Sequence, residues 1–494
     1  MTTEQSESNY RHVLKYTGIY GIVQVLIILI GLVRNKAMAV LIGVDGLGFN
    51  SLMMSMQNFA SQTTSLGISY GAVPRLSEYY EQRNSSRLGY YIKVIRLWSL
   101  MAAVLGLLFC VGLSPFVDQW SFTWGNHTLH YAMLGLSVAM IALTGGETAI
   151  LKATRCLGPI ARIQIYSAII AVVLSLPLYF IYEQSGIVPA ILLISFFTML
   201  LTMSYSYRRY PLRLSFRRSL LSDGMGMIRL GVAFVVAAAV GSAAELAIRS
   251  YLNVEGGLYE VGLYNAAFMI TITYAGMVFS SMESDYFPRL SAVQKDVVAM
   301  NDTVNKQMEV SMLLLAPMLV VLIMMLPVLI PMLFSREFMP VVAMAQVAVL
   351  AMYFKVLTMP VAYISLARSR SLVFLSLETS YYVALVVAVV VGFRCWGIYG
   401  TGLAIVVAHV FEFVLTMTVA YLQYSYRCTK GIVAYASVQM AVGALAFVVS
   451  LVCDGWMYWT AEAALAIAST AYSLNILRQK TRLWESLKRK LTRS

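Results

Sequence analysis

Long runs of apolar residues recur from one end of the chain to the other, separated by short polar segments. A run of about 18 or more apolar residues is long enough to cross the hydrocarbon core of a membrane as an α-helix. The pattern therefore predicts about fourteen membrane-spanning helices. They are expected near residues 14–42, 47–73, 93–116, 129–151, 163–182, 187–206, 226–250, 258–284, 309–333, 341–366, 371–393, 397–424, 431–453 and 456–477. No polar stretch is left for a separate soluble domain, so we expect an all-α, polytopic membrane protein.

The composition agrees with this class of protein. Of the 494 residues, 60% are hydrophobic and 12% are charged, whereas about a quarter of the residues of a soluble domain are charged. The five cysteines are scattered and odd in number, which indicates neither a disulfide framework nor a metal cluster. The sequence contains no phosphate-binding loop and no pairing of a nucleophile with a base, so we expect neither an enzyme nor a bound cofactor.

The basic residues predict the orientation, because loops rich in Lys and Arg stay in the cytoplasm. With the N-terminus placed inside, 30 of the 36 Lys and Arg residues fall on inner segments or at the inner ends of spans, two fall outside and four fall deeper within spans. We therefore expect a protein of the bacterial inner membrane with both termini in the cytoplasm. The basic clusters flank the spans and do not coat a folded face. They favour anionic phospholipid head groups as partners, and not nucleic acid.

The two halves of the chain resemble each other at an offset of 214 residues. The segment Pro74–Ser77 recurs as Pro288–Ser291, and Gly43 has its counterpart in Gly257. Each copy holds six spans, an even number, so both copies run through the membrane in the same direction. This pattern predicts a parallel repeat, whose copies are related by an axis along the membrane normal.

The repeat divides the chain into three segments. Residues 1–218 form an N-terminal lobe with spans one to six, and residues 219–425 form a C-terminal lobe with spans seven to twelve. Residues 426–494 hold the last two spans and a basic cytoplasmic tail. Equivalent residues of the two lobes are expected at equal depth, facing each other across a central seam.

Four cations fall well inside the predicted spans, away from their inner ends, where charged side chains are costly and usually mark a pathway. Arg34 and Lys36 lie in the first span, Arg249 in the seventh, and Lys355 near the middle of the tenth. Together they predict a positively charged cavity at the seam. The alternative is internal pairing, since Glu245 lies four residues before Arg249 and could neutralise it.

Span two carries a stripe of Ser, Asn and Gln at heptad-like spacing that includes Asn58 and Gln62. A stripe this polar would be costly against lipid. We therefore expect it to line water or substrate.

Several acidic residues also fall within spans. Glu147 and Glu245 are candidates for binding a coupling ion or for charge pairing. For Glu147 we favour a position near the inner head groups with no special role. Glu378 and Glu412 are further partners for the cations. Glu412 and His409 have a spacing that can hold a metal, but without further ligands we expect a hydrogen bond within the helix, and no metal site.

Three stretches resemble the Wzx-type O-antigen flippases. They are NKAMAVLIGVDGLG at residues 35–48, the stretch from VGLY to FPRLS at residues 261–291, and GIYGTG at residues 397–402. The resemblance covers most of the chain and rests on glycines and small residues, so it indicates the multidrug/oligosaccharidyl-lipid/polysaccharide (MOP) exporter superfamily better than it indicates one substrate. It implies two six-helix lobes in a V, around a cavity that opens alternately to each side. The two extra helices also occur in the related lipid II flippases.

The resemblance implies a flippase that moves undecaprenyl-diphosphate-linked oligosaccharide, an O-antigen or capsular repeat unit, to the outer leaflet. The four cations would hold the diphosphate, while Asn58 and Gln62 would contact sugar. Polysaccharide polymerase and chain-length machinery are the implied protein partners. One alternative is an ion-coupled multidrug exporter of the same superfamily, for which an acidic cavity is expected. A membrane-embedded polymerase or ligase is a further alternative, but the longest outer loop, about residues 116–128, is short for such an enzyme.

Overall fold

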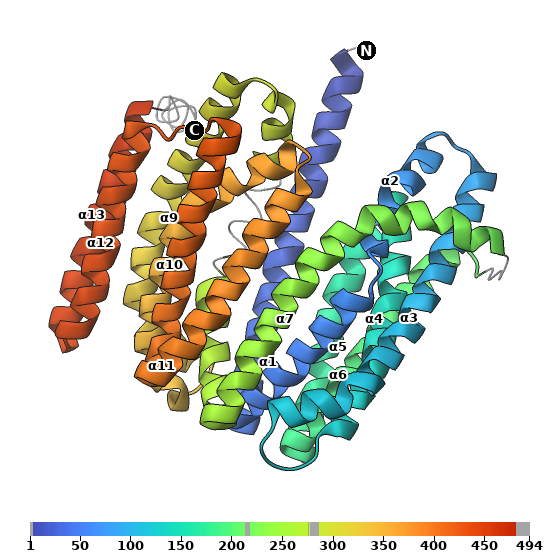
Figure 1. The fold of residues 1–494 in the computed structure, drawn as a ribbon, viewed down its shortest axis with the longest axis horizontal. Helices are drawn as coiled ribbons and strands as arrows, with labels where there is room; N and C mark the ends of the chain where they lie inside the picture. Colours follow the sequence, from blue (N-terminus) through green and yellow to red (C-terminus); the bar gives the residue numbers. More distant parts are fainter. Residues whose placement is uncertain (1–2, 213–217, 275, 277–285, 481–494) are drawn as a thin grey trace, which may run out of the picture. The chain divides into compact units, whose positions relative to one another are not determined.

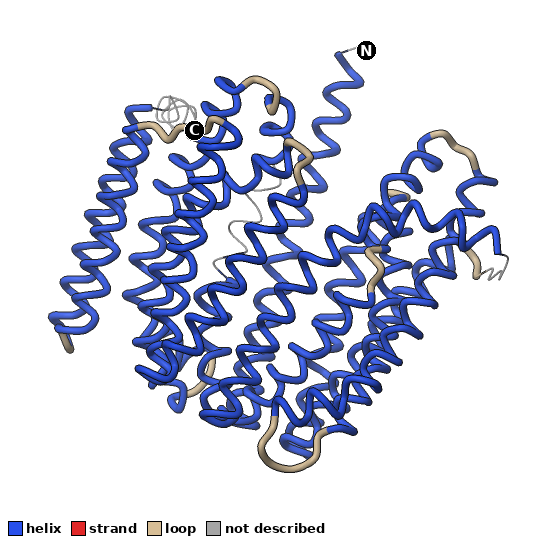
Figure 2. Tube along the Cα trace, viewed as in Figure 1, coloured by secondary structure: helices blue, strands red, loops and turns tan. Residues whose placement is uncertain are grey.

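The computed structural model describes residues 3–212, 218–274, 276 and 286–480, and in these residues all regular structure is helical (Figures 1 and 2). The expected all-α class is confirmed. The helices are α1 Thr3–Thr64, α2 Ile68–Glu81, α3 Ser85–Ser121, α4 Thr128–Ala153, α5 Leu157–Tyr182, α6 Ile187–Arg209, α7 Arg218–Phe268, α9 Val297–Leu333, α10 Val342–Ala367, α11 Ser371–Tyr424, α12 Lys430–Val452 and α13 Gly455–Lys480. Short 3₁₀ segments at Glu183–Gly186 and Arg336–Val341 and a π-helical segment at Met269–Tyr274 complete the described elements.

Three of these helices are far longer than a membrane is thick, and each is broken once. The breaks lie at Gly43 in α1 (φ 68°, ψ −167°), at Gly257 in α7 (φ 84°, ψ 177°) and at Gly397 in α11 (φ 56°, ψ −144°). A positive φ is open to glycine at little cost, which is why the chain can change direction there within one residue. Each break falls at a predicted boundary between two spans, so each long helix joins residues of two consecutive predicted spans.

Nine helical segments of the described chain are long and apolar enough to cross a membrane. This number is smaller than fourteen partly because the broken helices count once each. The last predicted span corresponds to α13, which is not one of the nine. The predicted eighth span, 258–284, lies partly outside the described residues. The number of spans therefore stays a prediction.

The predicted repeat is visible in a pair of close backbone contacts between α1 and α7. A Cβ atom added to Gly48 would lie 2.1 Å from the carbonyl oxygen of Leu258, and one added to Gly262 would lie 2.1 Å from that of Val44. Gly48 and Gly262 are 214 residues apart, as are Val44 and Leu258. The glycine of α1 contacts a carbonyl of α7, and the equivalent glycine of α7 contacts the equivalent carbonyl of α1. Such a reciprocal pair of contacts is the pattern that a twofold axis produces. Small residues allow such close approach of membrane helices.

By its contacts the described chain divides into two compact units. Unit 1 comprises Met1–Gly262 with Leu333–Ser335, and unit 2 comprises Leu263–Met332 with Arg336–Ser494. The first part of α7 belongs to unit 1 by this criterion. The division expected from the sequence, at 1–218, 219–425 and 426–494, is based on the repeat and not on contacts. It stays a prediction.

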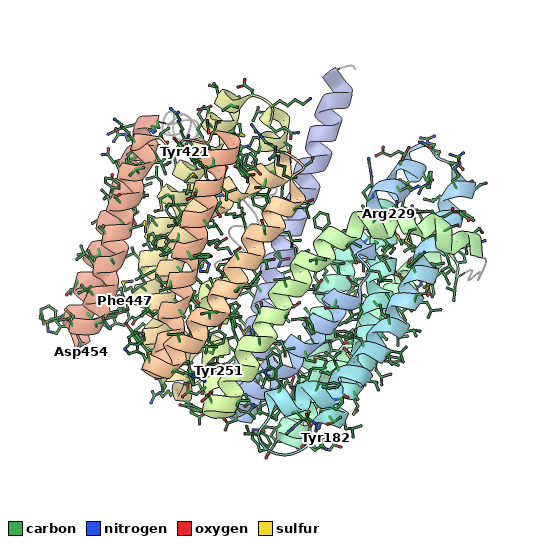
Figure 3. All side chains as sticks on the ribbon, in the orientation of Figure 1. Tyr182, Arg229, Tyr251, Tyr421, Phe447 and Asp454 are labelled. Carbon is green, nitrogen blue, oxygen red and sulfur yellow. The ribbon has the colours of Figure 1, made fainter. Side chains whose placement is uncertain are left out.

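The first turns of α7 are attached to α2 and α3 of unit 1. The indole nitrogen of Trp98 donates to the Leu220 carbonyl at 3.4 Å, and the Tyr90 hydroxyl donates to Asp223 at 2.7 Å. The ring of Tyr70 stacks on Phe234, with centroids 5.2 Å apart. The same segment carries the exposed Arg229 (Figure 3). These contacts explain why residues 218–262 cluster with unit 1.

Unit 2 is organised around α10, which is buried along most of its length. The Tyr353 hydroxyl donates to the Ala316 carbonyl of α9 at 3.2 Å, and Gly443 of α12 packs against the Tyr353 ring. The Tyr458 hydroxyl of α13 donates to the Met324 carbonyl at 2.9 Å. Gln346 of α10 in turn donates to that hydroxyl at 3.3 Å. The two C-terminal helices are therefore an integral part of unit 2.

Candidate functional site

Arg34 is a cation on α1, inside a candidate membrane span, and no described residue neutralises its charge. Its side chain is half-buried, and its Nη2 atom lies 3.5 Å from the hydroxyl of Tyr179 on α5. Its Nε atom is buried and has no partner within the described chain. Among the described residues no carboxylate lies within ion-pair distance of Arg34. A guanidinium in such a setting is costly unless an anion or water meets it.

Lys36 lies two residues further along α1, and its ammonium group donates to the carbonyl oxygen of Phe334. Phe334 follows directly after the end of α9 and clusters with unit 1. Carbonyls at a helix C-terminus lack partners within their own helix and attract cations. One role of Lys36 is thus to satisfy this helix end.

Arg249 on α7 is 6% exposed and paired within its own helix. Its Nη1 atom donates to the Glu245 carboxylate at 3.1 Å and to the Glu245 carbonyl at 3.3 Å. Of the two expectations for Arg249, the structure contains the i, i+4 ion pair. The Glu245 side chain is 38% exposed, so the pair is open on its acidic side.

The polar stripe of the second predicted span is divided in the structure. Ser51 and Ser55 are buried, and the Ser55 hydroxyl donates to the Ser51 carbonyl at 2.7 Å. Asn58 and Gln62, one and two turns further on, are exposed at the surface of unit 1. Exposed amides at membrane depth need partners from water or a ligand. Asn58 and Gln62 are therefore open to water or a ligand, whereas Ser51 and Ser55 are not.

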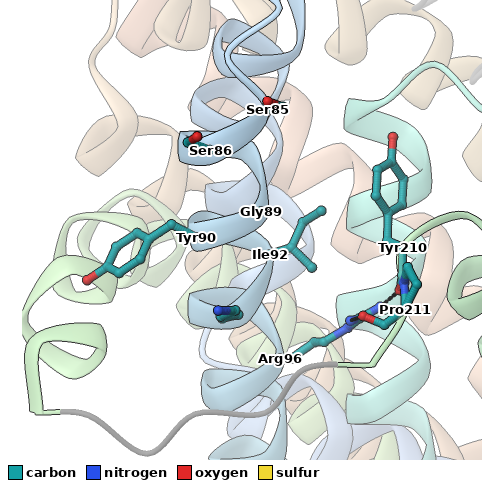
Figure 4. A pocket seen from close by; sticks show the side chains of 9 residues that line it. Ser85, Ser86, Gly89, Tyr90, Ile92, Arg96, Tyr210 and Pro211 are labelled. Carbon is teal, nitrogen blue, oxygen red and sulfur yellow. Dashed lines mark hydrogen bonds between the residues drawn. The ribbon is translucent and has the colours of Figure 1, made fainter.

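Glu147 forms a buried ion pair that the sequence does not reveal. Its carboxylate accepts from Arg96 Nε at 2.8 Å and Nη2 at 3.2 Å, and from the Ser206 hydroxyl at 2.6 Å. Arg96 also donates to the carbonyls of Pro211 and Tyr210, at 3.0 Å and 2.8 Å (Figure 4). The network joins α3, α4 and α6 and borders a pocket of about 410 Å³ between α3 and the chain after α6. Both carboxylate oxygens of Glu147 accept hydrogen bonds from Arg96 or Ser206. This arrangement favours charge pairing over the binding of a coupling ion for this residue.

We expect Glu147→Leu to destabilise the protein by about 3–5 kcal/mol, because it leaves the Arg96 guanidinium buried without a counter-charge. The measurement is the thermal unfolding temperature of the purified protein in detergent. The control is Glu81→Gln, which breaks an exposed ion pair with Arg155 and should change that temperature little. Equal effects of the two substitutions would show that the buried network does not stabilise unit 1.

Unit 2 contains a second charged cluster, in which acids outnumber the cation. Lys355 on α10 lies 6.0 Å from the ring centroid of Tyr381 on α11, and its charge interacts with Glu378 and Glu412. One carboxylate oxygen of Glu412 is buried and has no partner in the described chain. His409 Nδ1 lies 2.9 Å from the Ile405 carbonyl, so this nitrogen carries the proton. Its Nε2 atom then accepts from the Tyr381 hydroxyl at 3.5 Å.

The structure thus distributes the four predicted cations over different surroundings. Arg34 is paired with no acid among the described residues, and Lys36 caps a helix end. Arg249 is paired with Glu245, and Lys355 belongs to an acidic cluster of unit 2. Sequence reasoning did not single out Arg96 or Tyr179. Each is a polar residue on an otherwise apolar helix, which is a visible signal in the sequence. The partner of each lies on another helix, so the spacing of residues along one helix does not identify it.

Comparisons with known proteins place these features in a wider context. Residues 37–343 match the family model described as polysaccharide biosynthesis protein. No curated protein sequence matches the chain. The fold is similar to that of the lipid II flippase MurJ in an inward closed conformation, with a TM-score of 0.69 at 12% identity over 94% of this chain and 99% of that chain.

Two further solved structures share the fold. One is an inward-facing multidrug resistance MATE family transporter of the MOP superfamily, with a TM-score of 0.65 at 14% identity over 79% of this chain and 94% of that chain. The other is a MOP superfamily transporter from Pyrococcus furiosus, described by the reverse polarity of its binding pocket. It has a TM-score of 0.57 at 14% identity over 83% of this chain and 96% of that chain. At these identities the similarity concerns the fold alone.

Proposed function

The chain belongs to the polysaccharide biosynthesis protein family and has the fold of the MOP exporters, and from this premise we propose that it is a lipid-linked oligosaccharide flippase. Its substrate is undecaprenyl-diphosphate-linked oligosaccharide, an O-antigen or capsular repeat unit, which it moves from the inner to the outer leaflet by alternating access. The observation that carries the proposal is Arg34, a cation in a candidate span that no acid of the described chain neutralises.

Arg34 and Lys36 hold the diphosphate in this proposal. A guanidinium presents several donors in a fixed plane that suits phosphate oxygens, and hydrogen bonds between charged groups are about twice as strong as neutral ones. The buried Nε atom of Arg34, which lacks a partner in the described chain, supports an anion as the missing acceptor. Arg249 and Lys355 are secondary candidates, because carboxylates already surround them.

Asn58 and Gln62 contact sugar hydroxyls in this proposal. An amide side chain offers both a donor group and an acceptor, as a sugar hydroxyl does, so one residue can bind a hydroxyl in either sense. Both amides are exposed on α1, in the same unit as Arg34. The charged and the sugar-binding groups would then meet one substrate within unit 1.

An ion gradient supplies the energy in this proposal, and the acids within the spans are the groups that would bind the ion. In unit 2, Glu378 and Glu412 face the single charge of Lys355, and Glu412 has a buried oxygen with no partner in the described chain. Glu245, half-exposed beside Arg249, is the candidate in unit 1. Glu147 is the weaker candidate, since Arg96 and Ser206 occupy its carboxylate.

The protein is further proposed to lie in the bacterial inner membrane with both termini in the cytoplasm. Its basic loops would contact anionic phospholipids, and the polysaccharide polymerase and chain-length machinery would receive its product. The ion-coupled multidrug exporter is the alternative within the same superfamily. It is less well supported, because the matching family model is one of polysaccharide biosynthesis and Arg34 would repel a cationic drug.

Depletion of the protein in its own cell is expected to leave undecaprenyl-diphosphate-linked oligosaccharide in the inner leaflet and to reduce surface polysaccharide at least tenfold. The measurement is mass spectrometry of extracted lipids, combined with an immunoblot of surface polysaccharide. Re-expression of the chain from a plasmid is the control and should reverse both changes. Increased drug sensitivity without accumulation of a lipid-linked glycan would favour the exporter and exclude the flippase.

A further inference from the structure

Unit 1 contains a cavity of about 280 Å³ between the start of α2, α4 and α6. Most of its polar lining consists of hydroxyl groups, and one ammonium group belongs to it. The residues concerned are Ser69, Thr144, Thr148, Lys152, Ser195 and Thr198. We call this space the hydroxyl cavity.

The hydroxyl cavity exists because small residues line it. A Cβ atom added to Gly145 on α4 would lie 3.1 Å from the Ser69 hydroxyl, which is tighter than ordinary van der Waals contact. Ala149 follows one turn later on the same helix and also borders the cavity. Side chains between packed helices normally leave few voids larger than a water molecule, so a space of this size is not expected from packing alone. Its volume lies near the lower limit of ligand pockets, about 300 Å³, and suits a single ring better than a chain of rings.

The hydroxyl groups retain capacity for a ligand. Those of Ser69, Thr148 and Thr198 have no hydrogen-bond partner in the described part of the chain, and none of the three side chains is fully buried. Thr144 donates to the Met140 carbonyl at 2.7 Å, which leaves its lone pairs available. Thr144, Thr148 and Thr198 lie in α4 and α6, both within candidate membrane spans. At that depth hydroxyl groups need a partner other than lipid.

Ser195 of the cavity wall is held by hydrogen bonds to polar side chains outside the cavity. The hydroxyl of Ser195 shares a hydrogen bond of 2.6 Å with that of Ser137. Ser137 in turn accepts from the buried Gln57 of α1 at 2.5 Å. These hydrogen bonds fix the Ser195 hydroxyl at the cavity wall, where it faces a ligand with a set orientation.

Lys152 provides the charge at one end of the cavity. It lies in the last turn of α4, is exposed, and has no acidic partner in the described chain. Its position beyond the neutral hydroxyl groups creates a gradient from an uncharged to a cationic lining. A ligand that matches this lining has several hydroxyl groups at one end and a phosphate at the other.

We propose that the hydroxyl cavity binds a sugar phosphate, with the sugar ring among the hydroxyl groups and the phosphate at Lys152. The proposal rests on the proposed function, to which it adds a second phosphate position, at Lys152, separate from the one at Arg34 and Lys36. The sugar next to the phosphate at Lys152 then occupies the hydroxyl cavity. Ser and Thr hydroxyls donate and accept, and so pair with sugar hydroxyls in either direction. Ile141 and Ile194 supply the apolar surface against which the C–H groups of a ring pack.

The test uses the purified full chain in nanodiscs of phosphatidylcholine and two short synthetic probes. One probe is a polyprenyl diphosphate that carries one N-acetylhexosamine, and the other is the same diphosphate without the sugar. Thr148→Val should weaken binding of the sugar probe about fivefold, the loss of roughly one hydrogen bond, and leave binding of the bare diphosphate unchanged. Lys152→Gln should weaken both probes, and Lys152→Arg should bind both as the wild type does.

Matched variants protect the result against a folding defect. Thr148→Ser keeps the hydroxyl and should restore binding of the sugar probe. Thr202→Val, on α6 outside the cavity, removes a hydroxyl that bonds only to the Thr198 carbonyl, and should bind as the wild type does. Competition separates the sources of the ligand: a soluble hexose 1-phosphate that displaces the sugar probe at equal concentration assigns the cavity to a soluble ester, and failure to displace it assigns the cavity to the lipid-linked form.

Two outcomes would overturn the assignment. If Thr148→Val binds the sugar probe as tightly as the wild type, the hydroxyl cavity does not hold the sugar. If phosphatidylglycerol displaces the sugar probe from the wild type but not from Lys152→Gln, the cavity is a phospholipid site. Either result leaves the flippase proposal intact, provided that the wild type binds the sugar probe. Failure of the wild type to bind either probe, without accumulation of lipid-linked glycan on depletion, would instead reject the flippase itself.

Discussion

Replacement of Arg34 by alanine is expected to reduce export of the lipid-linked oligosaccharide by at least 30-fold while the protein continues to fold. The truncation removes one partner of a desolvated, charged hydrogen bond to phosphate, a change that costs about 2–5 kcal/mol in comparable interfaces. The folded protein loses only a long hydrogen bond of 3.5 Å to Tyr179. The measurement is surface polysaccharide in a strain that expresses the variant, together with the amount of protein in the membrane.

Two further variants separate binding from structure. Arg34→Lys keeps the charge but not the planar donors, so we expect activity between those of Arg34→Ala and the wild type. Tyr179→Phe removes the only described acceptor of Arg34 and should have a small effect if that hydrogen bond merely orients the side chain. Arg229→Ala, at an exposed position of α7, is the control for the loss of an arginine as such. Normal polysaccharide from a well-expressed Arg34→Ala variant would remove the main support for the substrate proposal.

The fold follows from the sequence to a large extent, because its determinants are local. Long apolar runs predict spanning helices, and the boundaries between these runs coincide with the points at which the three long helices change direction. Gly43, Gly257 and Gly397 all lie at such points and all have a positive φ in the structure. The offset of 214 residues predicted that equivalent glycines occupy equivalent positions, and the contacts of Gly48 and Gly262 agree with it.

The electrostatic partners could not be predicted in the same way. Spacing along one helix identified the pair of Glu245 and Arg249, because both residues lie on that helix. Arg96 was counted among the cytoplasmic cations, but it pairs with Glu147 from a neighbouring helix. The periodicity of a helix indicates which of its faces is polar, but not which residue of another helix faces it.

The same limit applies to the hydroxyl cavity. Its residues are ordinary Ser and Thr positions on apolar helices, and each is compatible with a hydrogen bond to the helix backbone, as found for Thr144. Only the packing of α2, α4 and α6 brings them together around one space. A positively charged cavity of all four cations was the sequence-based expectation. In our proposals unit 1 instead has two separate places for phosphate, one at Arg34 and one at Lys152.

Substitution of Gly48 by alanine is expected to prevent correct packing of α1 against α7, with a loss of stability of about 3 kcal/mol or more. The added Cβ atom would lie 2.1 Å from the Leu258 carbonyl oxygen, and a backbone atom cannot move aside as a flexible side chain can. Because the contact is reciprocal, Gly262→Ala should cause a defect of similar size through the Val44 carbonyl. The control is Gly31→Ala on the same helix, where nothing lies within 4 Å of the added atom.

Fluorescence-detected size-exclusion chromatography and the thermal unfolding temperature measure this effect. Both variants at the contact should give less monodisperse protein and a lower unfolding temperature than Gly31→Ala, and the double variant should be no more than slightly worse than either single one. The last expectation follows from the geometry, because a single shift of α1 away from α7 relieves both clashes. The losses of stability caused by substitutions at residues in contact are not additive. If Gly48→Ala were damaging and Gly262→Ala as stable as the control, the two halves of the repeat would not share the contact equally, and the twofold relation between α1 and α7 would have to be abandoned.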